Sequence, residues 1–235
     1  MIAVAALCPA PPLLVPELTG AEAALPDVRE ACLAAAGELT AAEPDAVAVL
    51  GTGGQARRWD PGSGLNLAAF TAGRRPRPAV GEPNLPAALG VGAWLLTAAG
   101  YRGTRVLQSV GSDEPAAACA GVGAALAAAP GRLALLVMAD GSARRTLRAP
   151  GYLDPRAEAF DAATERAVRS GRLDALLAVD RALAAELMAH GVPALQAMAG
   201  ALAGRQVRAQ IRYCGAPLGV GYLVASLRVG GAGLP

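Results

Sequence analysis

Residues 133–143 have the sequence LALLVMADGSA, in which an unbroken apolar run stands directly before a polar segment. Such a run is typical of a strand that is covered on both faces of a sheet. Comparable runs occupy 2–7 and 46–50, and the second is followed by Gly51-Thr52-Gly53-Gly54. The pattern predicts buried strands whose carboxyl ends open into polar or glycine-rich loops.

Helical stretches alternate with these strands. Val28, Cys32, Ala35 and Leu39 repeat at helical spacing behind Pro26, which suits a first turn. The remaining expected helices cover 86–99, 114–128, 155–170, 173–177, 181–190 and 193–202, and further strands are expected at 65–70, 104–110, 206–213 and 220–229. Ser112 or Asp113 is placed to cap the helix at 114. This order predicts a three-layer α-β-α sandwich around a mixed, mainly parallel sheet, formed by a single domain over 1–235.

Composition narrows the class of protein. All 21 basic residues are arginine and the net charge is +2, too small for a nucleic-acid surface, so no nucleic-acid partner is expected. The chain is alanine-rich (about a quarter of its residues), which indicates a high-GC bacterial genome. The four cysteines show no paired spacing, and the first residues lack the positive charge of a signal peptide. We expect a cytoplasmic protein with reduced thiols and no membrane segment.

Several motifs share one order along almost the whole chain. They are the strand and proline loop at 7–16, Glu43-Pro44-Asp45 before a strand, Asp140-Gly141-Ser142-Ala143, the run 151–161, the segment 191–202, and Gly219-Val220-Gly221-Tyr222-Leu223. In this order the chain resembles the class III extradiol ring-cleavage dioxygenase family, whose fold the Memo-type proteins share. The resemblance implies the same domain over 1–235 and membership of an oxidoreductase family.

The resemblance also implies a non-haem Fe(II) held by two histidines and a glutamate, with a further histidine as acid–base group. This chain has one histidine, His190. The ligand positions fall at Cys8, at Thr52-Gly53 and near Ala189, and the acid–base position falls at Ala143. These side chains cannot form the facial triad that binds Fe(II). We therefore predict that the iron site is absent and that the chain needs no cofactor.

Six residues are the pocket candidates that follow from these positions: Cys8, Thr52, Gly53, Asp140, Ser142 and Glu186. Cys8 is a candidate nucleophile, although a small buried apolar side chain is the simpler interpretation. Thr52 and Gly53 belong to a glycine turn that could present N–H groups to an anion. Asp140 and Ser142 either orient a substrate or cap their own loop.

Glu186 and His190 are four residues apart, so a helix over 181–190 would place them on one face. They are either a replacement metal pair or a surface pair beside a helix end that Gly191 terminates. The simpler surface interpretation is the one we expect.

Three hypotheses follow for the function. The first is a pseudoenzyme that keeps the pocket and binds a small anionic or aromatic molecule, or a protein partner. The second is an enzyme of metal-independent chemistry that uses Cys8, Asp140 or His190. The third, ranked last, is an active dioxygenase with unusual ligands. A homo-oligomer is also expected, because the family often forms oligomers and alanine-rich helices pack closely.

Overall fold

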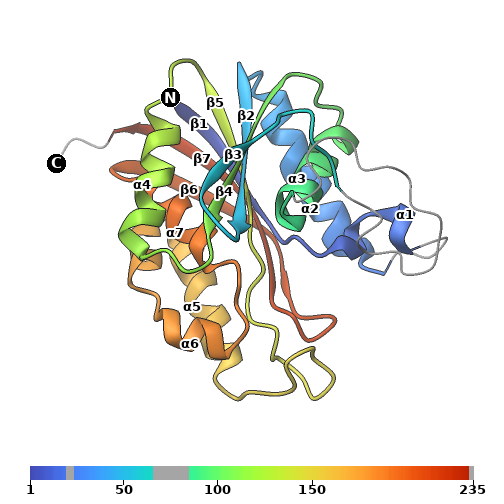
Figure 1. Cartoon of the computed structure of the whole chain (residues 1–235). Coiled ribbons are helices and arrows are strands. Elements are labelled where there is room, and N and C mark those ends of the chain that lie inside the picture. The colour runs from blue at the N-terminus through green and yellow to red at the C-terminus, as the bar shows by residue number, and fades with distance from the viewer. Residues whose placement is uncertain (20–23, 66–84, 233–235) are drawn as a thin grey trace.

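The apolar runs of the sequence form the centre of a mixed sheet (Figure 1). The structure is a computed structural model that describes residues 1–19, 24–65 and 85–232. Its strands are β1 (Ile2–Cys8), β2 (Ala46–Gly53), β3 (Arg57–Trp59), β4 (Thr104–Gly111), β5 (Leu133–Met138), β6 (Arg205–Gly215) and β7 (Tyr222–Ala232). Their order across the sheet is β3-β4-β2-β5-β1-β7-β6.

The four central strands, β4, β2, β5 and β1, are parallel, and the outer strands β3, β7 and β6 are antiparallel to their neighbours. In the register, Leu50 pairs with Val137 and Leu7 pairs with the same residue from the other side. All six residues of β5 are buried. The central position of β5 explains why its apolar run has no polar alternation.

Helices cover both faces of the sheet (Figure 1). They are α1 (Pro16–Thr19), α2 (Pro26–Ala41), α3 (Ala87–Ala98), α4 (Ala116–Ala127), α5 (Ala157–Ser170), α6 (Arg181–Glu186) and α7 (Val192–Ala201), with 3-10 turns η1 (Pro12–Leu14) and η3 (Leu173–Ala178). Alternate side chains of β2 separate the two layers: Ala48 and Leu50 belong to the core under α4 and α7, whereas Val47 and Val49 belong to the core under α2 and α3. The predicted three-layer α/β sandwich is confirmed.

Helix α7 is the most deeply buried helix of the described residues, because it lies between α4 and the sheet. Glycines allow the two helices to approach closely. A Cβ on Gly123 would lie 1.8 Å from the carbonyl oxygen of Ala197, and one on Gly200 would lie 2.1 Å from that of Ala120. The start of α7 forms part of the wall of a cavity described below.

Some predicted details were wrong. Helix α6 ends at Glu186, where a helix to residue 190 was expected, because Met188 adopts a left-handed φ of 56° and Ala189 N donates to Ala184 O. Glu186 and His190 therefore do not share a helix face. Helix α4 begins after Pro115 without a side-chain cap, so neither Ser112 nor Asp113 caps it.

The segment between β2 and α3 was expected to hold one strand at 65–70. All but the first residue of that range falls outside the described residues. The unexpected strand β3 lies earlier in the segment and pairs with β4, and Trp59 Nε1 donates to Ser109 Oγ at 2.8 Å. None of the described helices combines the length and apolar character that a membrane crossing needs.

Candidate functional site

The chain leaves neighbouring central strands toward opposite faces of the sheet. After β1 and β2 it continues to α2 and α3 on one face, and after β5, which lies between them, it continues to α5 on the other. Ligands of open α/β sheets bind where such connections diverge, at the carboxyl ends of the strands. Here that position lies around Asp140, which follows β5.

Asp140 is fixed in this crevice by backbone contacts. Its Oδ1 accepts a hydrogen bond from Ala10 N at 2.9 Å, and Ala139 N donates to Cys8 O at 2.9 Å, so β1 and β5 remain joined beyond their last residues. Burial raises the pKa of the Asp140 carboxyl from 3.8 to about 6, and the Ala10 N–H and the nearby His190 oppose that rise. The carboxyl therefore titrates in a range suited to acid–base chemistry or to ligand binding.

His190 comes to Asp140 through the turn between α6 and α7. The next residue is Gly191, and a Cβ there would lie 2.4 Å from the carbonyl oxygen of Asp140. Glycine is required at position 191 because the turn packs directly on the backbone of Asp140. The sequence had predicted another reason, namely that Gly191 ends a helix, and that prediction was wrong because α6 ends at Glu186. His190 itself is exposed.

A cavity of about 330 Å³ opens beside His190, and we refer to it as the His190 pocket. Ser112 and Asp113 from the loop after β4, Arg181 from α6, and the start of α7 at Pro193 complete its walls. Its lining combines one guanidinium, one imidazole and one carboxylate with small apolar side chains. Arg181 was not among the predicted site residues.

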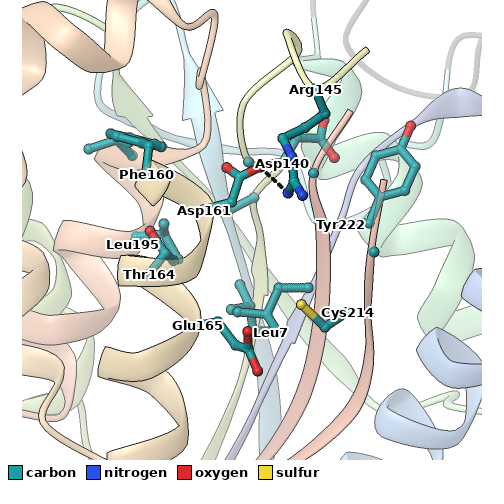
Figure 2. Close-up of a pocket in the computed structure, with 16 residues that line it drawn as sticks. Leu7, Asp140, Arg145, Phe160, Asp161, Thr164, Glu165, Leu195, Cys214 and Tyr222 are labelled. Atoms are coloured by element: carbon teal, nitrogen blue, oxygen red, sulfur yellow. Dashed lines mark hydrogen bonds and ion pairs between the residues drawn. The ribbon is translucent and has the colours of Figure 1, made fainter. Parts of the chain in front are cut away.

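Asp140 lines a second, smaller cavity, which lies between α5 and the strands β6 and β7 (Figure 2). Its walls include Leu7, Phe160 and Leu195, and the side chains of Cys214 and Glu165 hydrogen-bond to each other there. The cavity measures about 40 Å³. That is well below the roughly 150 Å³ of a cavity that accepts benzene, so this cavity is too small for an aromatic ring.

Cys8 points away from both cavities into the apolar core beneath α2. It is fully buried and contacts the thiol of Cys32. The hydrogen bond between these thiols and the burial of the pair raise the pKa of Cys32. This placement, fully buried against a second thiol, favours Cys8 as a small buried side chain.

Thr52 and Gly53 end β2 beside Asp140. Thr52 is on the face of β2 that Ala48 and Leu50 share, and its buried Oγ1 has no hydrogen-bond partner among the described residues. A Cβ on Gly53 would lie 2.8 Å from Pro86 Cγ and 3.0 Å from Ser109 Cβ. There is no room for a larger side chain at position 53.

Ser142 and Glu186 are not part of either cavity's lining. Ser142 is fully buried, its N and Oγ donate to Asp161 at 2.8 and 2.7 Å, and Arg145 pairs with the same carboxylate at 3.2 Å. Asp161 thereby fastens the loop after β5 to α5, a role that the sequence motif did not reveal. Glu186 is exposed and pairs with Arg156 at 2.8 Å.

These placements test whether the residues suit the Fe(II) site that the resemblance implies. The positions expected to carry ligands hold the buried thiol of Cys8, the cramped Gly53 and a turn with a single imidazole. Ala143, at the acid–base position, is buried and its N donates to Leu187 O. Among the described residues no cluster of three or more His, Cys, Asp or Glu could hold a metal ion. The residues do not fit a facial triad.

Comparisons with known proteins identify the fold and leave the family open. No protein-family model matches the chain, and no curated protein matches it. Among solved structures, the chain is similar to the uncharacterized protein JW3007 from Escherichia coli K12, with 19% identity and a TM-score of 0.54. The match covers 95% of this chain and 99% of that one. At this identity the similarity is one of fold.

Proposed function

We propose that this protein binds a small molecule at the carboxyl edge of its sheet, on a scaffold of the class III extradiol dioxygenase type that lacks the Fe(II) site. The observation that carries the proposal is Asp140. A carboxyl group is held at the point where the strand connections diverge, close to His190, and His190 lines a cavity that is large enough for a ligand. Ionisable groups with strongly perturbed pKa values cluster at functional sites.

A second candidate is a metal-independent enzyme in which Asp140 acts as an acid–base group. The elevated pKa of Asp140, about 6, favours this candidate, because a group that titrates near the working pH exchanges protons efficiently. The neighbouring His190 would supply a second proton-transfer group. The position of Cys8 argues against a role as nucleophile, because its thiol is buried against Cys32.

Binding can be tested by NMR, because His190 is the only histidine in the chain and its imidazole signals need no sequence-wide assignment. A library of small carboxylates, amides and phenols is titrated against the protein, and the His190→Gln variant identifies the signal. Saturable shifts of the imidazole signal are expected for a subset of compounds. If no compound shifts it, the proposed binding site is refuted.

Iron binding is tested separately. The untagged protein is incubated anaerobically with Fe(II), desalted and analysed for metal, and oxygen consumption is then followed with catechol. We expect no stoichiometric iron and no ring cleavage. One iron per chain together with a ring-cleaved product would overturn the loss of the dioxygenase site while leaving the binding of small molecules intact.

A further inference from the structure

We infer that the His190 pocket recognises the carboxylate of a small organic monoacid, and that Arg181, which Gln196 holds in position, selects it. This inference rests on the proposed binding function and names its ligand class. It starts from a feature that the fold itself leaves unexplained: a guanidinium in the wall of the pocket that has no acidic partner among the described residues.

Arg181 is held in place by neutral oxygens only. Its Nη1 donates to Gln196 Oε1 at 3.3 Å and its Nη2 donates to the backbone oxygen of Ser112. It forms no ion pair with an acid in the part of the chain that the structure describes. A guanidinium has five N–H donors, so most remain for a ligand, and their planar arrangement matches a carboxylate.

Gln196 is fully buried, and its Nε2 has no hydrogen-bond partner among the described residues. It is the only strongly polar side chain within the otherwise apolar helix α7. Arg181 fixes the orientation of the amide, because the guanidinium needs the acceptor oxygen and turns the donor away from itself. Gln196 does not line the pocket, so its part is to hold the guanidinium of Arg181 at the pocket wall.

The surrounding charges favour one negative charge. Val192 and Pro193, the first residues of α7, line the pocket, and that end of the helix has neither a side-chain cap nor an acidic residue in its first turn. The positive end of the helix dipole therefore faces the cavity uncompensated. Asp113 at the exposed rim opposes a second negative charge, which selects a monocarboxylate over a dianion such as phosphate.

The size of the cavity sets the upper limit of the ligand. About 330 Å³ exceeds the roughly 150 Å³ that accepts benzene. The cavity therefore has room for a ring or a short chain attached to the carboxylate. Ala184, Ala185 and Ala189 supply an apolar wall for that part of the molecule.

Three probes test the inference: benzoate, its neutral analogue benzamide, and inorganic phosphate. Each is titrated into the protein while the His190 imidazole signal is followed by NMR. Benzoate is expected to bind at least about tenfold more tightly than benzamide, because charge-assisted hydrogen bonds are about twice as strong as neutral ones. Phosphate is expected to bind more weakly than benzoate.

Two variants assign the effect to residues. Arg181→Gln is expected to lose the preference for benzoate over benzamide, and Arg208→Gln, which removes the same charge from an exposed position on edge strand β6, is expected to keep it. Gln196→Leu should weaken benzoate binding several-fold while benzamide binding changes less. Arg181→Lys, which keeps the charge, serves if Arg181→Gln does not fold, and it is expected to retain part of the preference.

The outcomes distinguish a failure of carboxylate selection from a failure of the proposed small-molecule binding. Equal binding of benzoate and benzamide refutes carboxylate selection but leaves a small-molecule site. Tighter binding of phosphate than of benzoate refutes the preference for a single charge. Unchanged selectivity in both Arg181 variants refutes the assignment to Arg181. If no probe and no library compound shifts the His190 signal, the proposed function itself fails.

Discussion

Replacing Asp140 by Asn should stabilise the protein at neutral pH. Burial holds the pKa of this carboxyl at about 6 in the folded state, compared with an ordinary value of 3.8. Each pKa unit corresponds to about 1.4 kcal/mol, so ionised Asp140 costs up to about 3 kcal/mol of folding free energy. Asn has nearly the same shape, and its Oδ1 can still accept the hydrogen bond from Ala10 N.

The sign of the effect follows from proton linkage. Between pH 3.8 and about 6 the folded protein keeps the proton that the unfolded chain has lost, so stability falls as the pH rises through this range. Below the range both states are protonated and Asp140 has no cost. The Asn variant is neutral throughout. Its advantage should therefore grow from about 1 kcal/mol at pH 4.5 to about 3 kcal/mol at pH 7.5.

Urea unfolding followed by circular dichroism at pH 4.5 and 7.5 measures this difference. For a chain of this length the gain at pH 7.5 corresponds to a rise of about 6–12 °C in Tm. Asp154→Asn is the matched control: Asp154 lies beside Arg156, whose hydrogen bond lowers the pKa of Asp154 to about 2, so removing its charge should bring no gain. A gain for Asp140→Asn that is absent, or equal at both pH values, would refute the reasoning.

Three further predictions concern the same region and its supports. His190→Gln should raise the pKa of Asp140, because His190 favours the ionised carboxylate; carboxyl 13C shifts followed against pH measure this. Gly123→Ala should destabilise the protein by about 3 kcal/mol in urea unfolding, since its Cβ meets the backbone of α7, whereas Gly121→Ala, with open space around it, should gain up to about 1 kcal/mol. Of the four thiols, only the exposed Cys214 should react rapidly with a thiol reagent in the native state; rapid reaction of a second thiol would contradict the buried positions of the others.

The strands were predictable because each carries its signal locally. β5 is apolar along its whole length and is buried on both faces, as its sequence indicates. The order of strands has no such local signal. β5 lies between β1 and β2, which come earlier in the chain, and this insertion depends on packing between segments that are distant in sequence.

The end of α6 shows where a local pattern fails. Residues 181–190 contain good helix formers, yet the helix stops at Glu186 and Met188 takes a left-handed conformation that its residue type does not favour. The turn is needed to bring Gly191 against the backbone of Asp140. Tertiary packing overrides helix propensity here, and it separates Glu186 from His190.

The candidate site was partly predictable. Asp140 and His190 were expected from their positions after a strand and in a family slot, and the structure brings them close together. Arg181 has no distinguishing pattern, since it is one of many arginines in the chain. Gln196 did carry a signal, because a single polar residue stands within the apolar stretch 192–202. Such a residue needs a partner, and its neighbours in sequence cannot supply one.

A chain selected for stability alone would not keep an ionisable carboxyl group at position 140, where burial raises its pKa to about 6. Asn at position 140 would remove this cost at neutral pH, and the change needs no new space. The cost of an ionisable carboxyl at position 140 is accounted for if Asp140, together with the nearby His190, binds a ligand or transfers a proton, because functional sites are where proteins retain residues that lower their own stability.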